Sequence, residues 1–380
     1  MNIPFNRPAV VGRELNNIVQ ALSDRHFSGD GSFTRRCHEW LERETGTAKA
    51  LLTHSCTAAL EMAAILADLK PGDEVILPSF TFVSTANAVA LRGAVPVFVD
   101  IRPDTLNLDE SKVEDAITDR TRAIIVVHYA GVACEMDAFE AITRRRELIL
   151  IEDAAQGMRS TYKGRPLGSI GALGTFSFHE TKNVISGEGG ALLVNDSRLI
   201  SRAEIIREKG TNRSSFFRGQ VDKYTWVDIG SSYLPGEIIA AFLYAQLEDS
   251  TALTESRRRV WDRYHEAFAE LERDGKVRRP VVPPDCGHNA HLYYLLLPDL
   301  TTRTRFIARL KERGIAALFH YVPLHDSPAG RQFGRAHGSL DVTSAVSDRL
   351  VRLPLWAGLD EQTSETVIDA VNDVLATAVA

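Results

Sequence analysis

Lys182 is the residue in this sequence whose surroundings most clearly suggest chemistry. Residues 174–190 read GTFSFHETKNVISGEGG, so Lys182 follows the alternating, strand-like GTFSF and precedes a run of glycines. Lysine side chains are usually exposed to solvent. An amine drawn into a partly apolar site instead loses basicity and becomes a usable nucleophile and base. The chemistry of Lys182 therefore depends on the groups that the fold brings to it.

A carboxylate and an amide follow another apolar run. Asp153 ends the run LILIED, and Gln156 comes three residues later. A carboxylate at the end of a buried strand is costly without a partner, which could be a backbone amide, an arginine, a metal or a protonated ring nitrogen. Ordinary helix or turn capping by Asp153 is the alternative. His128 and His179 could join a metal site, but no spacing such as HxxxH supports one.

Small hydroxyl residues mark a candidate anion site. Residues 55–58, SCTA, follow the apolar run AKALLTH and open a helix-like segment. Free backbone N–H groups and the helix dipole favour phosphate at such a position, and Ser177 could add a hydroxyl donor. Simple capping by Ser55 or Thr57 is the alternative. Phe82, after another apolar run, is either a core residue or a flat face against which a planar cofactor stacks.

Together these groups suit one cofactor, pyridoxal phosphate. It needs a lysine to carry it covalently and a carboxylate to keep its pyridine nitrogen protonated. It also needs a phosphate site, and it commonly has an aromatic side chain stacked on its ring. Lys182, Asp153, residues 55–58 and Phe82 offer all four. No single feature is specific, but the combination is considerably more so.

The elements that must position these residues alternate between strands and helices. From residue 45 to residue 200, apolar runs typical of buried parallel strands alternate with helix-like segments such as TAALEMAAILADL and ESKVEDAIT. The strand-like runs are AKALLTH, DEVILP, VPVFVD, RAIIVVHYA, LILIEDA, GTFSF and GALLVN. This order predicts an α/β protein with a mostly parallel sheet covered by helices on both faces. Ligands bind at the carboxyl ends of such strands, which is where the polar residues above lie.

The last third of the chain predicts a second, smaller unit. AHLYYLLLP and IAALFHYVPLH look like strands, and TRFIARLKERG and SETVIDAVNDVLATAV look like helices. We expect a large domain over residues 1–250 and a small α+β domain over residues 251–380, with the boundary near residues 247–255. The amino-terminal helix VVGRELNNIVQALSD could pack on either part.

Composition argues against several classes of protein. Lys and Arg total 44 of the 380 residues against 50 Asp and Glu, and no basic run interrupts this acidic balance, so a nucleic-acid partner is not expected. The four cysteines lie far apart and predict neither a disulfide framework nor a zinc site. The amino terminus lacks a signal pattern, and no apolar run approaches the roughly 20 residues that span a bilayer. A cytoplasmic protein without a membrane partner is expected.

Several motifs resemble the DegT/DnrJ/EryC1/StrS sugar aminotransferase family. The most informative are IEDAAQG, SFHETKN and GEGGALLVN, and the resemblance extends over nearly the whole chain. SFHETKN and REKGTNRSSFFRGQVDKYTW are especially similar to the branch that makes dTDP-4-amino-4,6-dideoxygalactose for bacterial surface glycans. The resemblance implies a fold type I enzyme that depends on pyridoxal 5'-phosphate and works as a homodimer with shared active sites.

The resemblance also implies roles for individual residues. Lys182 would hold pyridoxal phosphate, and Asp153 would face its pyridine nitrogen. Gln156 would lie beside the ring hydroxyl oxygen, and Phe82 would stack on the ring. The phosphate contacts would come from Thr57, Ala58 and Ser177.

One turn departs from the family pattern. Many members carry a GxNxR-like turn whose asparagine reaches the phosphate bound by the neighbouring subunit. Here residues 230–234 read GSSYL, so Ser232 replaces the asparagine and Leu234 replaces the arginine. A serine can still donate one hydrogen bond, which keeps Ser232 as a candidate cross-subunit cofactor contact.

Two further segments carry candidate substrate-binding residues. His320, Tyr321 and His325 in FHYVPLH could close over a sugar, and buried packing in a strand is the alternative. Lys209 and Arg213 in REKGTNR could bind nucleotide phosphates, and a solvated basic face is the alternative.

The resemblance implies amino transfer from glutamate to a nucleotide-linked keto-sugar. The expected reaction converts dTDP-4-dehydro-6-deoxy-D-glucose to dTDP-4-amino-4,6-dideoxy-D-galactose. Amination at C3 of a 3-keto-6-deoxy sugar is an alternative, because the motifs read the cofactor and not the sugar. A non-catalytic, regulatory protein that binds pyridoxal phosphate is another alternative. A family variant that dehydrates its substrate has histidine in place of the lysine, and the presence of Lys182 disfavours it.

Overall fold

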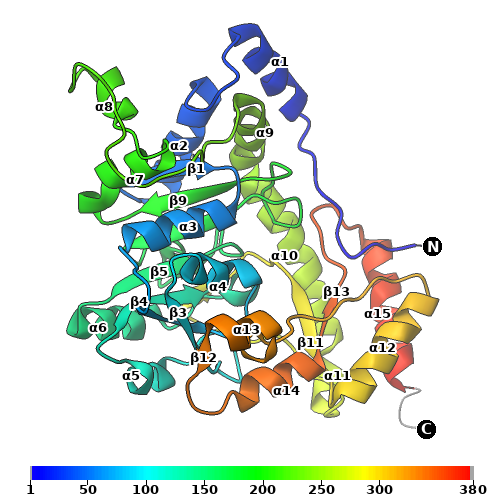
Figure 1. The fold of residues 1–380 in the computed structure, drawn as a ribbon. Coiled ribbons are helices and arrows are strands. Elements are labelled where there is room, and N and C mark those ends of the chain that lie inside the picture. Colours follow the sequence, from blue (N-terminus) through cyan, green and yellow to red (C-terminus); the bar gives the residue numbers. More distant parts are fainter. Residues whose placement is uncertain (1, 377–380) are drawn as a thin grey trace.

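An eight-stranded sheet forms the centre of the protein, seen here in a computed structural model that describes residues 2–376 (Figure 1). The strand order is β1-β9-β8-β5-β4-β2-β3-β12. The strands are β1 (Lys49–Thr53), β2 (Glu74–Pro78), β3 (Val95–Val99), β4 (Thr121–Val127), β5 (Ile149–Asp153), β8 (Leu173–Ser177), β9 (Gly190–Val194) and β12 (Arg335–Ala336). Among these described strands, only β9 runs against its neighbours, which confirms the predicted, mostly parallel α/β sheet.

Both faces of this sheet are buried under helices. In β4, Ile124 and Val126 join one apolar cluster, and Ala123 and Ile125 join another on the opposite face. The first cluster includes side chains of α2 (Ser32–Thr45), α6 (Met136–Arg146) and α9 (Glu237–Glu248), and the second those of α3 (Cys56–Leu66), α4 (Val83–Ala90) and α7 (Ile200–Arg207). Burial on both faces explains why the strands read as continuous apolar runs rather than as alternating ones.

Shorter elements complete the larger unit. A small sheet contains β6 (Thr161–Tyr162), β7 (Arg165–Pro166) and β10 (Cys286–Gly287). The remaining helices of this region are α1 (Glu14–Asp24), α5 (Val113–Ala116) and α8 (Arg213–Phe217). Short 3-10 turns are η1 (Glu110–Lys112), η2 (Tyr129–Gly131), η3 (Ser197–Leu199) and η4 (Leu324–Asp326). The segment ESKVEDAIT, predicted as a helix, is therefore a 3-10 turn followed by a four-residue helix.

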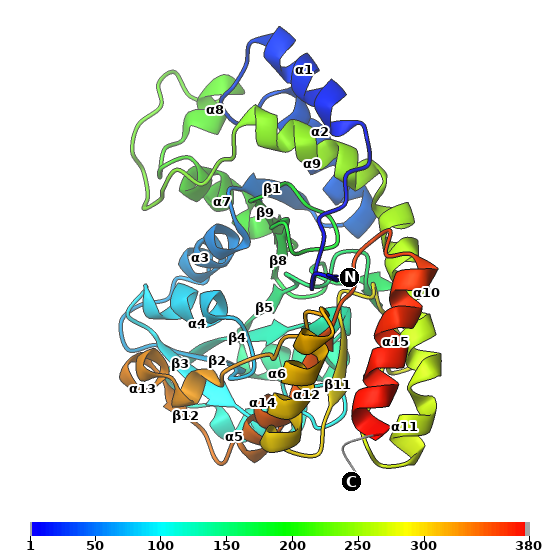
Figure 2. The ribbon, with the colours of Figure 1, turned by 90° about the vertical axis from the view of Figure 1, so that its right-hand side faces the viewer.

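The carboxyl-terminal part builds its own core. Its strands β11 (Tyr293–Leu296) and β13 (Leu350–Leu353) pair antiparallel. Its helices are α10 (Ser250–Ala267), α11 (Ala269–Arg273), α12 (Leu300–Glu312), α13 (Pro328–Phe333), α14 (Asp341–Arg349) and α15 (Glu361–Ala376). Figure 2 shows α10 and α15 side by side at one edge of the molecule. α9 ends at Glu248 and α10 begins at Ser250, and a division into two domains at residue 250 stays a prediction.

The segment IAALFHYVPLH, predicted as a strand, differs from that prediction. It makes only isolated bridges, from Ile315 to Ile3 and from Leu318 to Arg352. The segment then leaves the small unit, and the N–H of Leu324 donates to the carbonyl of Ser79 in the large one (3.1 Å). A regular strand is excluded because the chain crosses between two units here instead of staying beside one partner strand.

The amino-terminal segment contacts both units. Ile3 is buried in the apolar core of the small unit, whereas α1 packs against α9 of the large unit. The side-chain amide of Asn17 in α1 donates to the carbonyl of Ala241 in α9 (3.2 Å). Figure 1 shows the chain running from the N-terminus beside the small unit to α1 at the far end of the molecule. The helix α1 thus packs on the large unit, which is one of the two positions that the sequence left open.

Candidate active site

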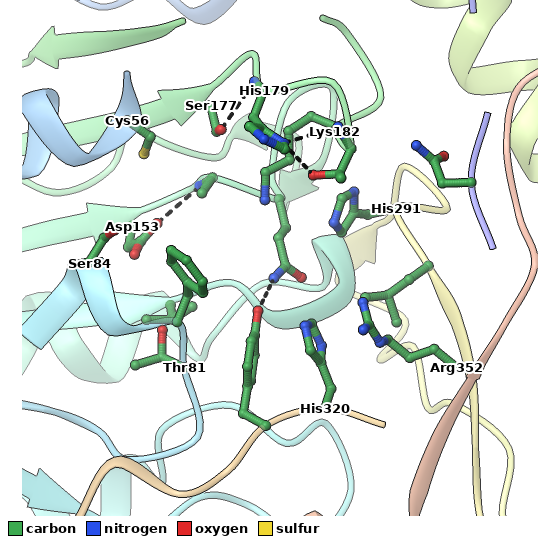
Figure 3. A pocket seen from close by; sticks show the side chains of 18 of the residues that line it. Cys56, Thr81, Ser84, Asp153, Ser177, His179, Lys182, His291, His320 and Arg352 are labelled. Carbon is green, nitrogen blue, oxygen red and sulfur yellow. Dashed lines mark hydrogen bonds between the residues drawn. The ribbon is translucent and has the colours of Figure 1, made fainter. Parts of the chain in front are cut away.

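A cavity of about 430 Å³ opens at the carboxyl ends of the strands (Figure 3). Segments from the large unit, the small unit and the amino terminus all line it. Of the residues singled out in the sequence, the cavity brings together Thr57, Phe82, Asp153, Gln156, Ser177, Lys182, His320 and Tyr321. Its size lies within the usual range for sites that bind small ligands and cofactors.

Lys182 points into the cavity from the turn after β8. Its N–H donates to the carbonyl of His179 (2.9 Å), which fixes the turn. The side-chain amide of the next residue, Asn183, donates to the carbonyl of Asn289 (2.8 Å) and ties the turn to the small unit. Burial lowers the pKa of the Lys182 amine, and the negative charge of Asp153 opposes that effect. The amine is therefore more readily deprotonated than that of a surface lysine.

Asp153 faces the same space as Lys182 from the end of β5 (Figure 3). One of its carboxylate oxygens accepts from the hydroxyl of Thr85 (2.7 Å), and the other from the N–H of Ala155 (3.2 Å). Burial raises the pKa of Asp153, and the hydrogen bond from Thr85 opposes the rise. Within residues 2–376, no cationic side chain forms an ion pair with this carboxylate, so a cationic group in the cavity would stabilise its charge.

Gln156 connects the large unit to the small one across the cavity. Its carbonyl oxygen accepts from the N–H of Ala130 (2.7 Å), and its amide nitrogen donates to the hydroxyl of Tyr321 (3.2 Å). The ring of Tyr321 stacks on that of His320, with centroids 3.5 Å apart, and Tyr129 contacts His320 through its hydroxyl (3.2 Å). Burial lowers the pKa of His320, with the charge of Arg352 acting in the same direction, so its ring is neutral. These contacts bring small-unit residues to the cavity wall.

The start of α3 forms another part of the wall. Ser55 caps this helix by accepting from the N–H of Ala58 (3.1 Å), and the N–H groups of Cys56 and Thr57 precede the first intrahelical hydrogen bond. The hydroxyls of Thr57 and Ser84 lie 2.8 Å apart. Gly190 in β9 passes so close that a Cβ there would lie 2.4 Å from the nitrogen of Cys56. Glycine at position 190 therefore allows the sheet to approach the opening of the helix.

Other residues singled out in the sequence do not line the cavity of the single chain. Ala58 is buried, with its N–H already used by Ser55. His325 contacts the hydroxyl of Ser79 through Nδ1 (2.7 Å). The remaining ones, Lys209, Arg213 and Ser232, gather on Glu208 outside the cavity: the two cations lie 3.0 and 3.7 Å from its carboxylate, and Ser232 pairs with it through the backbone. The roles implied for these residues stay predictions.

The sequence analysis missed several residues that line the cavity or support it. Arg257, His291 and Arg352 line it from the small unit, and Thr85 supports Asp153 from α4. His291 contacts the side-chain oxygen of Asn183 through Nδ1 (2.9 Å) and so braces the turn that carries Lys182. Arg352 had a local signal, because a charged residue interrupts the short apolar strand LVRL. The others depend on contacts between distant segments, which local patterns do not show.

These residues fit pyridoxal phosphate. The cavity places a buried amine opposite a carboxylate that has no ionic partner in the described chain, and it adds a helix opening suited to phosphate. By contrast, the described residues contain no group of three or more His, Cys, Asp or Glu side chains arranged to hold a metal ion. The fold and the cavity define the class of protein as a pyridoxal phosphate-dependent aminotransferase.

Comparison with known proteins places the chain within this class. It belongs to the DegT/DnrJ/EryC1/StrS aminotransferase family, whose model matches residues 9–372. It is 33% identical to the spore coat polysaccharide biosynthesis protein SpsC of Bacillus subtilis, over 98% of this chain and 97% of SpsC. It is also 33% identical to GDP-perosamine synthase of Caulobacter vibrioides, over 97% of each chain.

A solved structure supports the cofactor assignment. The pyridoxal phosphate form of the sugar aminotransferase-like protein Spr1654 of Streptococcus pneumoniae matches 99% of each chain with a TM-score of 0.91 and 27% identity. The protein is thus a sugar aminotransferase that depends on pyridoxal phosphate. In the part of the chain that the structure describes, no helix is both long enough and apolar enough to cross a membrane.

Proposed function

We propose that this enzyme moves an amino group from glutamate to the nucleotide-linked sugar dTDP-4-dehydro-6-deoxy-D-glucose. The product would be dTDP-4-amino-4,6-dideoxy-D-galactose. The resemblance of SFHETKN and of residues 207–226 to the corresponding branch of the family supports this substrate. Two relatives are named for related reactions, GDP-perosamine synthase and the UDP-4-amino-4-deoxy-L-arabinose–oxoglutarate aminotransferase of Shewanella sediminis, which is 31% identical over 98% of each chain.

The observation that carries the proposal is the placement of Lys182 opposite Asp153 in one cavity (Figure 3). When bound, pyridoxal phosphate supplies an electron sink for the carbon that loses its proton during amino transfer. Lys182 holds the cofactor, and its amine then moves the proton at the Cα atom of the donor, a role suited to its lowered pKa. Asp153 keeps the ring nitrogen protonated by placing a negative charge beside it.

Other residues of the cavity orient the cofactor and the sugar. Gln156 would lie beside the ring hydroxyl, and Phe82 would stack on the ring. Phe82 lines the cavity and is 59% exposed, so a planar group can cover it. Thr57 and Ser177 would bind the phosphate together with the opening of α3. His320 and Tyr321 close the sugar side of the cavity from the small unit.

The proposal also includes the form and place of the enzyme. We place the reaction in the cytoplasm, in keeping with four cysteines that are all unpaired. The active form is a homodimer, in which Ser232 reaches the phosphate of the neighbouring site. The exposed position of Ser232 outside the cavity of its own chain supports that arrangement.

Product analysis tests the proposed reaction. The purified enzyme, incubated with glutamate and dTDP-4-dehydro-6-deoxy-D-glucose, should give a product with nitrogen on C4 and axial geometry by NMR. Lys182→Ala should lose the visible absorbance of lysine-bound cofactor and at least 10²-fold in rate, because it removes both the covalent link and the proton carrier. Lys311→Ala, on the exposed face of α12, should keep both. Turnover of only the 3-keto isomer would show amination at C3 and contradict the proposal.

A further inference from the structure

Arg352 extends into the cavity from the small unit. It lies in β13 between Val351 and Leu353, which are both buried in the core of that unit. Because side chains alternate across a strand, Arg352 points to the opposite side from these neighbours. That side faces the cavity, and Figure 3 shows the Arg352 guanidinium beside His320, across the cavity from Asp153.

The guanidinium of Arg352 keeps most of its donors available. One terminal nitrogen donates to the carbonyl of Phe319 (3.0 Å). The Nε atom is buried, yet it has no hydrogen-bond partner among residues 2–376. A guanidinium has five N–H donors, and leaving a buried donor unsatisfied costs free energy. The orphan donor is therefore suited to a group that enters the cavity.

No protein carboxylate balances this charge within ion-pair distance in the described chain. The carbon at the head of the Arg352 guanidinium lies 4.6 Å from the centre of the Phe5 ring, which supports it from one side. Two hydrogen bonds between the backbones of Arg352 and Leu318 (2.7 and 3.2 Å) fix the base of the side chain. The lowered pKa of the neighbouring His320 keeps that ring from adding positive charge, and Arg257, the other arginine on this wall, donates to the carbonyls of Ala290 and His291. A fixed cation of this kind favours an anion with paired oxygens.

We propose that Arg352 binds anionic oxygens of a substrate and that its ligand is the carboxylate of the amino donor. The proposal rests on the proposed function and adds the residue that recognises the donor. The Arg352 charge is near enough to the reacting amine to lower the pKa of Lys182. The α-carboxylate of an amino acid is bonded to the very carbon whose proton Lys182 moves, so it must lie close to that amine. The phosphates of a 4-keto sugar nucleotide are separated from the reacting carbon by the sugar ring.

Binding measurements distinguish the two sources of anionic oxygens. Glutarate serves as a donor-like dicarboxylate and dTDP as the phosphate-bearing part of the sugar nucleotide, each titrated into the cofactor-loaded protein by calorimetry. Arg352→Gln should weaken glutarate binding and raise the KM for glutamate by about 10- to 150-fold, the value of a charged hydrogen-bonded contact. The same variant should bind dTDP as the wild type does. Arg305→Gln, on the exposed face of α12, should leave both affinities unchanged.

A second variant guards against misfolding. Arg352→Lys keeps the charge and most of the stem but loses the planar fork, so its glutarate affinity should lie between those of the wild type and Arg352→Gln. Loss of dTDP binding with unchanged glutarate binding would assign Arg352 to the phosphates and overturn the proposal. Unchanged affinities for both ligands would overturn it as well. If the proposed sugar is wrong, the enzyme will not aminate it, but the effect of Arg352→Gln on glutarate binding will be unchanged.

Discussion

The carboxylate of Asp153 is oriented by one side-chain hydroxyl and one backbone N–H. Thr85 in α4 donates to one of its oxygens (2.7 Å), and Thr81 contacts Thr85 through its own hydroxyl (3.0 Å). Thr85 is completely buried, and its hydroxyl reaches the cavity lining through Asp153 and Thr81. We expect it to act as a positioning residue, because it holds the carboxylate that we propose to face the ring nitrogen.

Thr85→Val tests this positioning role. The variant keeps the shape of the side chain but removes the donor, so Asp153 loses an interaction that favours its charged form. We expect about tenfold weaker binding of pyridoxal phosphate, measured by fluorescence titration of the cofactor-free protein, and a lower kcat with little change in KM. Thr143→Val is the matched control, since Thr143 is a buried threonine that donates to a carbonyl within its own helix α6. Equal cofactor affinity in both variants would contradict the role.

The sequence predicted the side chains that converge on the cavity better than it predicted the residues that support them. Lys182, Asp153 and Gln156 could be predicted because each follows an apolar run that a parallel sheet turns toward one edge. Thr85 and His291 could not, because each acquires its importance from a contact with a residue far away in the sequence. Local patterns report the period of an element, and they do not report which element lies opposite.

At the scale of elements, a buried carboxylate attaches β12 to the sheet. Glu74 begins β2 and accepts from Arg335 of β12 (2.8 and 3.2 Å) and from Arg120 (2.6 Å). β12 contains two residues and belongs to the carboxyl-terminal part of the chain. Such a short strand has no readable pattern, which is why the sequence did not predict it. The ion pair between Glu74 and Arg335, rather than an apolar pattern, fixes the position of β12 at the edge of the sheet.

Glu74→Gln should weaken this attachment. The hydrogen bond from Arg335, assisted by Arg120, lowers the pKa of Glu74 from 4.5 to about 2. Its charged form therefore stabilises the fold above pH 4.5, and this stabilisation disappears as the pH falls toward 2. We expect the variant to lose about 2 kcal/mol of unfolding free energy at neutral pH and to show less acid sensitivity in this range.

Chemical denaturation at several pH values measures both effects. Glu114→Gln is the control, because its ion pair with Arg145 (3.0 Å) is exposed on both sides and should contribute little. If Glu74→Gln lowers the free energy of unfolding by the same amount from pH 7 to pH 3, the charge of the carboxylate is not the cause.

The strands of the central sheet were the most predictable elements. Their apolar runs were long enough to be recognised because the sheet is covered on both faces. The segment from residue 315 to residue 325 has a similar composition, but it crosses between units and forms no strand. Composition alone cannot distinguish this segment from the strands of the sheet, since both bury some of their apolar side chains.

At the scale of the whole molecule, one end carries several exposed apolar side chains. On and after α8, Phe217, Tyr224 and Trp226 are exposed by 69%, 52% and 78%, and on α1 Leu15 is exposed by 70%. Figures 1 and 2 both show α1 and α8 at the same end of the molecule. We expect this surface to form the proposed dimer interface, and Ser232 lies a few residues after Trp226 in the chain.

Trp226→Asp tests whether this surface joins two subunits. The wild type should have a mass about twice the 42.0 kDa of the single chain by light scattering, and the variant should approach the mass of one chain. The separated chains should also bind pyridoxal phosphate less tightly, since each would lack the partner's contact to the phosphate. Leu300→Asp, at an exposed position of α12, should remain dimeric. A wild type that already has the mass of a single chain would exclude the proposed dimer.

The backbone bridge between Ile3 and Ile315 has a consequence for biosynthesis. A ribosome releases Ile3 early, but the partner of this residue emerges only after most of the polypeptide has been translated. The same holds for β3, whose outer neighbour β12 is made near the end. For most of its synthesis, the nascent chain therefore has an unpaired amino-terminal segment and an exposed edge strand, β3. These are the sites at which chaperones would be needed.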